Sequence, residues 1–65
     1  MTAGELTTLL IDLSLTSWDT SFSGKQVKVD GANNPTISLS AYPAAQTAIQ
    51  NLQNKGVTVL VNTVP

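Results

Sequence analysis

Apolar positions near the start of the chain recur at the spacing of one helical face. The stripe is formed by Leu6, Leu9, Leu10 and Leu13. Thr2 followed by Glu5 fits a capping box, in which the threonine hydroxyl accepts from an amide of the first turn and the glutamate accepts from the threonine amide. The pattern predicts a helix over residues 3–16. Trp18 and Phe22 fall where they could extend the stripe by two more turns.

The stretch after this helix alternates polar and apolar residues, as a half-buried strand does. Gly24 is the candidate stop of the first helix, and residues 26–30 then place Val27 and Val29 on one face. Turn-forming residues occupy 31–35, so the strand should end there and a loop should begin. Polar and apolar residues alternate again over 36–39, so the chain can be extended for these few residues before the next helix.

A second helix and a second strand complete the pattern. Ser40 is the candidate N-cap of this helix and Pro43 fits its first turn. Its apolar face consists of Ala44, Ala45, Ala48, Ile49 and Leu52. Lys55 suits the helix dipole and Gly56 can adopt the left-handed conformation that ends helices. Residues 57–62 alternate again and are rich in β-branched residues, with Val57, Val59 and Val61 on one face.

The order of elements predicts a mixed α/β fold. A strand, a helix and a second strand in succession form a parallel crossover, which lays the two strands side by side in a small parallel sheet. The valine pairs Val27/Val29 and Val57/Val59 occupy equivalent places in the two halves. We therefore expect residues 1–65 to form a single αβαβ module built from two helix-strand units of about thirty residues each.

Two segments carry a resemblance to known modules. Residues 26–34, a strand followed by Gly-Ala-Asn-Asn, resemble the strand-plus-asparagine turn of leucine-rich repeats. Residues 48–59 resemble the final helix and strand of short repeat-like modules in bacteriophage tail-fibre and other virion proteins and in some bacterial surface proteins, where a lysine-glycine turn leads into a last valine-threonine strand. The likeness covers most of residues 6–62. It implies a leucine-rich-repeat-like fold and a non-catalytic structural or adhesive role in a virion or another extracellular assembly.

The chain also departs from the repeat pattern. Val27 and Val29 stand where a leucine-rich repeat usually has leucine, and Pro35 follows Asn33 and Asn34 in the same loop. Either asparagine could therefore take the place of the buried asparagine of such repeats. The resemblance assigns no ligand-binding residue.

Composition limits both the stability of the chain and its partners. A chain of 65 residues buries only about 60% of the surface that its unfolded form exposes, so its own core leaves it marginally stable. It has no cysteine and no histidine, which excludes disulfides and the common zinc and copper sites. Three lysines, no arginine and a net charge of -1 cannot form a basic patch, so no nucleic-acid partner is expected. Ideal packing of the core or oligomerisation is then the expected source of further stability.

No signal peptide or transmembrane segment is predicted. The first residues lack a basic region, and the apolar run over 6–15 is short and contains Asp12. No membrane partner is therefore expected.

We predict no enzyme activity and no cofactor. The chain has no histidine to activate its serine and threonine hydroxyls, and no glycine pattern matches a phosphate-binding loop. Two of the carboxylates Glu5, Asp12, Asp19 and Asp30 could pair as acid and base, but solvated helix charges are the favoured interpretation. Asp30, Asn33 and Asn34 could offer oxygens to calcium, yet the EF-hand spacing and its glutamate are missing, and turn geometry is favoured.

The aromatic residues have two interpretations. Trp18, Phe22 and Tyr42 could form a patch that stacks on sugars or docks a partner, since aromatic rings concentrate in interfaces. For Trp18 and Phe22 we favour closure of the core between the first helix and the first strand. For Tyr42 both interpretations stay open.

The predicted sheet supplies the candidate partner interface. Helices cover one of its faces and leave the other face and two strand edges open. The candidate interface residues are Lys28, Asp30, Thr58, Leu60 and Asn62 on the open face, together with Tyr42. The leading hypothesis is a structural or decoration component of a larger assembly, with a phage virion as the setting and a homo-oligomer or larger particle as the partner. The alternative is a stand-alone module that binds a protein, a peptide or a carbohydrate on the open sheet face.

Overall fold

The chain folds into two helix-strand units that lie side by side. The computed structural model describes residues 1–18 and 24–65. Its elements, in chain order, are α1 (Ala3–Leu15), β1 (Gln26–Val29), β2 (Ile37–Ser38), α2 (Pro43–Asn54), β3 (Thr58–Val61) and β4 (Thr63–Val64). Unit one comprises α1, β1 and β2, and unit two comprises α2, β3 and β4. The mixed α/β class predicted from the sequence is confirmed, but each predicted helix-strand unit contains a second, short strand, and the leucine-rich-repeat-like character stays a prediction.

Helix α1 starts as the sequence predicts. The Glu5 amide donates to the Thr2 hydroxyl at 3.1 Å and the Thr2 amide donates to the Glu5 carboxylate at 2.7 Å, which completes the capping box. The helix ends at Leu15, one residue short of the predicted end, and Thr16 is already extended. Trp18 therefore does not continue the helix, and Gly24, with φ of +88°, leads into β1 instead of stopping α1. Phe22 lies outside the described residues.

The carboxyl end of α1 is capped by tertiary contacts. The Trp18 indole Nε1 donates to the Leu13 carbonyl at 2.9 Å. The Lys55 ammonium, which follows α2, donates to the Ser14 carbonyl and, at 3.4 Å, to the Thr16 carbonyl. The Leu13 carbonyl also accepts from the Thr16 amide at 3.2 Å, so the Trp18 indole adds a second donor there, while Lys55 supplies a donor to the Ser14 carbonyl at the end of the helix. Lys55 was expected to complement the dipole of its own helix, whereas it complements that of α1.

Helix α2 begins later than the predicted cap. Tyr42 occupies the N-cap position without a side-chain cap bond, and Pro43 takes the first helical position as predicted. The assignment of Ser40 as the cap is wrong, because Ser40 lies in a turn and its hydroxyl is 3.2 Å from the Ser38 hydroxyl. At the other end the chain reverses at Gly56, whose φ of +79° favours glycine.

Two parallel strand pairs replace the single sheet predicted from the sequence. Strand β1 pairs with β3, with Val27 opposite Val59 and Val29 opposite Val61. Strand β2 pairs with β4, with Ile37 opposite Thr63. The pattern placed Val57 in the second strand, whereas β3 begins at Thr58 and Val27 lies opposite Val59. The Val57 amide still bonds to the Leu52 carbonyl at the end of α2, so this residue belongs to the turn and not to β3.

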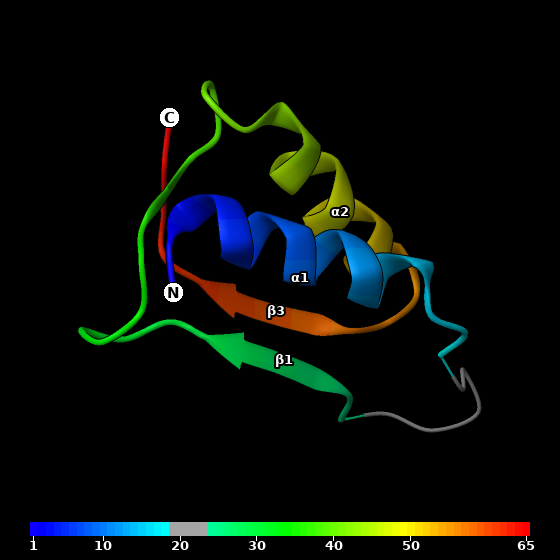
Figure 1. Ribbon diagram of the computed structural model, residues 1–65. Coiled ribbons are helices and arrows are strands. Elements are labelled where there is room, and N and C mark those ends of the chain that lie inside the picture. Colours follow the sequence, from blue (N-terminus) through cyan, green and yellow to red (C-terminus); the bar gives the residue numbers. More distant parts are fainter. Residues whose placement is uncertain (19–23) are drawn as a thin grey trace.

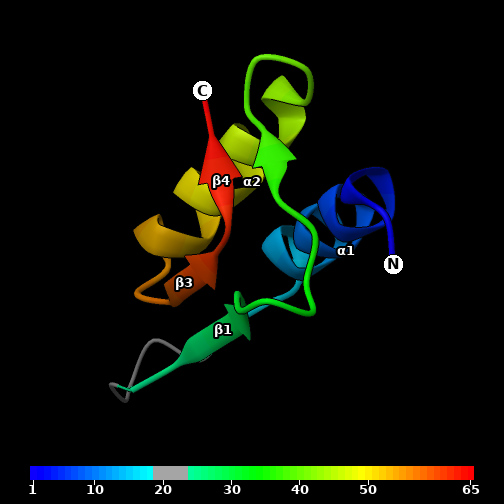
Figure 2. The ribbon, with the colours of Figure 1, turned by 90° about the vertical axis from the view of Figure 1, so that its left-hand side faces the viewer.

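Both helices lie on the same side of the strands and enclose the core between the layers. Figure 1 shows α1 and α2 on one side of β1 and β3, and the turned view in Figure 2 shows the two units next to each other. The core residues are Leu6, Leu10, Val27, Ile37, Ala45, Ala48, Leu52 and Val57. Trp18 is half-buried and packs against this core, which agrees with the core interpretation of this residue.

Candidate interaction surface

The register brings some of the predicted interface residues together on the face away from the helices. Lys28 of β1 lies opposite Leu60 of β3, and Thr58 lies two residues earlier on β3, on the same face. Lys28 and Thr58 are exposed and Leu60 is half-buried. Leu60 does not belong to the group of half-buried residues that pack on the core, whereas its neighbours Val59 and Val61 do. Lys28, Thr58 and Leu60 therefore form a row on the open face, as predicted.

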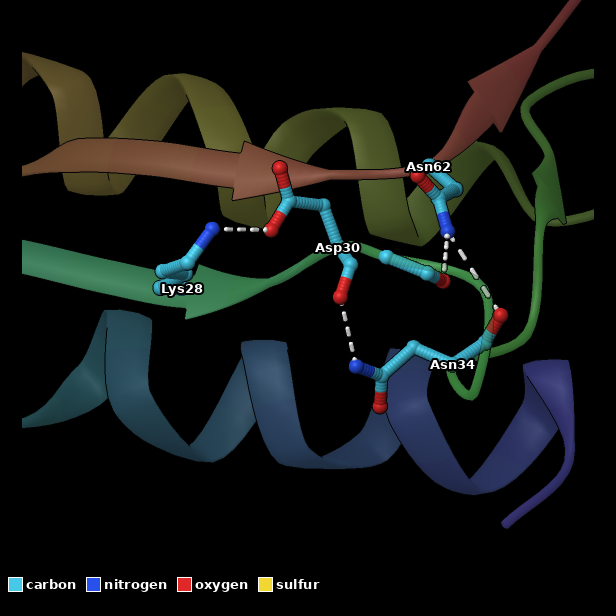
Figure 3. Close-up of polar contacts among 5 residues, drawn as sticks. Lys28, Asp30, Asn34 and Asn62 are labelled. Atoms are coloured by element: carbon cyan, nitrogen blue, oxygen red, sulfur yellow. Dashed lines mark hydrogen bonds and ion pairs between the residues drawn. The ribbon is translucent and has the colours of Figure 1, made fainter.

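Asp30 and Asn62 have internal partners that the sequence did not suggest. The Lys28 ammonium donates to the Asp30 carboxylate at 2.8 Å, and this hydrogen bond lowers the pKa of Asp30. The Asn62 amide nitrogen donates to the Gly31 carbonyl at 2.9 Å and lies 3.5 Å from the Asn34 carbonyl. Figure 3 shows Asn62 pointing into the loop while Asn34 reaches the Asp30 carbonyl.

These contacts attach a loop to the strands. Residues 30–36 form the loop that connects β1 to β2 in unit one, whereas the single residue Asn62 connects β3 to β4 in unit two. The Asn62 side chain holds the loop, and the backbone carbonyl of Asn62 accepts from the Ile37 amide at 2.9 Å where β2 begins. Asn34 donates to the Asp30 carbonyl at 2.7 Å. Asp30 and Asn34 thus shape and anchor the turn, which agrees with the favoured interpretation of this loop.

Tyr42 lies in the helix layer. A Cβ atom built on Gly4 would lie 3.6 Å from the Tyr42 hydroxyl oxygen, so the Tyr42 ring lies beside the first turn of α1. It is 37% exposed. The structure therefore does not bring Tyr42 to the Lys28–Leu60 row, and the six predicted interface residues do not form one surface.

A groove on the outer flank of unit two was missed by the sequence reasoning. It lies between α2 and the edge of β3 and β4 and has a volume of about 300 Å³. It is lined by Leu39, Gln46, Ile49, Gln50, Gln53, Val59, Val61 and Thr63. A wider hollow of about 540 Å³ shares Leu39, Gln46 and Thr63 and continues it toward Pro65. The sequence carried one signal for this exposed, uncharged helix flank, which is the spacing of three glutamines at i, i+4 and i+7, namely Gln46, Gln50 and Gln53.

Alternate residues of the strand that borders the groove direct their backbone amide and carbonyl groups away from unit one. In a parallel strand the amide and carbonyl of one residue point to the same neighbour, and the next residue points to the opposite side. The Thr58 amide bonds to Lys25 in unit one, and the Asn62 and Val64 carbonyls accept from unit one as well. Val59, Val61 and Thr63 must therefore direct their backbone groups outward, and the same three residues line the groove.

Metal-binding side chains do not gather in the described part of the chain. No three acidic, cysteine or histidine side chains within residues 1–18 and 24–65 lie close enough to hold a metal ion. Asp12 is exposed on α1, and Asp19 lies outside the described residues. No helix formed by those same ranges is long and apolar enough to cross a membrane.

Comparisons with protein-family models, with curated proteins and with solved structures found no match to this chain.

Proposed function

We propose that this protein is a non-catalytic structural module that works by associating with other protein chains, as a homo-oligomer or as part of a larger particle. The observation that supports the proposal is the groove beside α2, where Val59 and Val61 are only half-buried although they belong to the core-facing side of β3. The same strand directs backbone amides and carbonyls outward. An edge of this kind favours pairing with another chain.

The chemistry of the groove favours a protein partner. Its lining consists of aliphatic, threonine and glutamine side chains, with no charged residue among them. Aliphatic side chains gain free energy when a partner removes them from water, by about 25 cal/mol per Å². Glutamine side chains and strand backbone can hydrogen-bond to another backbone. A phage virion or another extracellular assembly, which the sequence resemblance implies, stays the proposed setting.

The proposal is tested by the mass of the protein in solution. Light scattering coupled to size exclusion, across a dilution series, should show a species heavier than the 6.8 kDa chain that dissociates on dilution. Circular dichroism at each concentration reports whether folding depends on association. A folded monomer at every concentration would refute the homo-oligomer and would favour the alternative function below.

A matched pair of variants tests whether the groove is the interface. Gln46→Lys/Gln53→Lys places two ammonium groups on the groove flank of α2, where association would have to desolvate them. Thr47→Lys/Asn54→Lys introduces the same residues one position later, about 100° away around the helix. All four positions are exposed, so both variants should fold. We expect only the first variant to dissociate; equal masses for both would exclude the groove as the contact.

The open sheet face supports the alternative function, a module that binds a peptide or carbohydrate. Leu60 is a half-buried aliphatic residue in the row that faces away from the helices, next to Lys28. A monomeric wild type whose Lys28, Thr58 and Leu60 amide signals shift in a glycan or peptide titration would favour this function. Leu60→Lys should then remove the binding and leave a folded monomer.

A further inference from the structure

We infer that the partner seated in the groove is a second copy of this chain, docked head to tail, so that unit one of the second copy continues the layers beside unit two of the first. This inference rests on the proposed function and names its partner. It requires a surface on unit one that complements the groove, and the structure supplies one.

The contact already exists once within the chain. Unit one and unit two meet through the parallel pairing of β1 with β3 and through the packing of α1 against α2. Figure 1 shows this arrangement, with α1 lying along α2 in one layer and β1 lying along β3 in the other. A second copy placed beside unit two would repeat it, with its β1 next to the first copy's β3 and its α1 next to α2.

The two outer strand edges match in direction and in spacing. Unit two directs the backbone groups of Val59, Val61 and Thr63 outward. In β1 the Lys25 carbonyl points to β3, so by the same alternation Gln26 and Lys28 point to the opposite, outer edge. A parallel pairing of Gln26 and Lys28 with the outer edge of β3 would use the strand geometry that β1 and β3 already have.

The two outer helix flanks also match in polarity. Ile11 and Ser14 of α1 face α2 across a shared hollow. At 100° per residue, Leu9 and Leu13 lie on the flank of α1 that faces away from α2, and both are half-buried. On the other unit, Ile49 is half-buried on the outer flank of α2. Docking would therefore bring leucines against Ile49 and the groove valines.

Charge does not oppose the contact. The groove is uncharged, and the positive charge of Lys28 on the incoming strand is balanced by Asp30 at 2.8 Å. The Lys28 side chain points to the open face and is 64% exposed, so pairing at the strand edge need not bury it. A partner with a strongly charged surface would instead leave charges unpaired against the glutamine row.

Each copy would then carry one groove and one complementary edge, which makes the contact heterologous. Contacts of this kind form rings or open chains and not a two-fold dimer. This property gives a complementation experiment. One variant has its groove blocked, Gln46→Lys/Gln53→Lys, and keeps its β1 edge. The other has its β1 edge blocked by Gln26→Pro, which removes an outward amide that β3 does not use.

We expect each variant alone to be a monomer of 6.8 kDa and an equimolar mixture to form a species of twice that mass, because the intact edge of one docks in the intact groove of the other. Gln26→Val, which keeps the amide, is the control for Gln26→Pro. Leu9→Lys blocks the helix flank and serves as a second edge variant if the proline variant does not fold.

The outcomes separate this inference from the proposed function. A wild type that is monomeric at every concentration refutes this inference and the homo-oligomer of the proposed function. A wild type that assembles while the mixture of variants stays monomeric overturns the head-to-tail contact alone. An edge variant that still dimerises by itself also overturns it, since the groove would then pair with a groove or hold a different partner.

Discussion

Replacing Asn62 by alanine removes the side chain that attaches the loop of residues 30–36 to the second unit. Its amide nitrogen donates to the Gly31 carbonyl at 2.9 Å, and the second contact, to the Asn34 carbonyl at 3.5 Å, is at the limit of a hydrogen bond. The backbone carbonyl of Asn62, which accepts from Ile37, is unaffected by the substitution. Asn62→Ala therefore tests the loop attachment without removing a strand bond.

The expected cost follows from these distances. One hydrogen bond of good geometry contributes about 0.5–1.5 kcal/mol, and the long contact adds little. We expect a loss of about 1 kcal/mol, which for a domain of this size lowers the Tm by about 4–8 °C. Asn62→Asp should cost more at neutral pH, because a carboxylate would face the Gly31 carbonyl with no proton to donate. Protonation of the introduced carboxyl at acid pH should reduce the difference.

Thermal unfolding followed by circular dichroism measures these changes, and hydrogen exchange shows where they act. The Asn34 amide, bonded to the Gly31 carbonyl at 3.1 Å, should exchange faster in Asn62→Ala. Asn33→Ala is the matched control, because Asn33 is exposed in the same loop and has no positive φ. If Asn62→Ala and Asn33→Ala have the same Tm, the Asn62 side chain does not stabilise the loop and its hydrogen bond to Gly31 contributes nothing to the fold.

Three further substitutions or conditions test other parts of the structure. Leu52→Ala, at a fully buried position, should lower the free energy of unfolding by about 2–5 kcal/mol, measured by urea titration. Lys55→Met keeps the aliphatic stem but removes the donor to the Ser14 carbonyl, and should cost about 1 kcal/mol in the same assay, with loss of helical signal. The hydrogen bond from the Thr2 amide lowers the pKa of Glu5, so its contribution to stability is present at neutral pH and is lost as pH falls below about 4.3 toward the lowered pKa. Glu5→Gln should therefore show a smaller loss of stability between pH 7 and pH 3; an equal loss would contradict the capping-box account.

The helices were predictable because their signals are local. The capping box and the leucine spacing depend only on neighbouring residues, and they placed the end of α1 within one residue of Leu15. Strand β2 lies within the alternating stretch 36–39, whereas β4 has only two residues and exists because it pairs with β2, so no window of sequence could identify β4. The second strand was predicted to start one residue early, because Val57 continues the valine alternation but completes the turn after α2 before β3 begins at Thr58.

The candidate site was predictable only in part, because several of its contacts join residues that are far apart in the sequence. Period-two alternation correctly placed Lys28, Thr58 and Leu60 on the open face. The roles of Asn62 and Lys55 depend on contacts with residues about thirty and forty positions earlier in the chain, which no local pattern encodes. The groove depends on which flank of α2 lies beside β3, and that choice is made by tertiary packing.

The marginal core and the groove have the same physical origin. A chain of 65 residues that buries a small set of aliphatic side chains leaves Val59 and Val61 half-covered at the edge of its second unit. Leu9 and Leu13 are half-covered at the edge of its first unit. If two copies meet through these edges, association buries both sets and supplies stability that the single core lacks. Folding and assembly should then depend on each other, so substitutions in the groove should lower the unfolding temperature of the assembled protein by more than they lower that of the monomer.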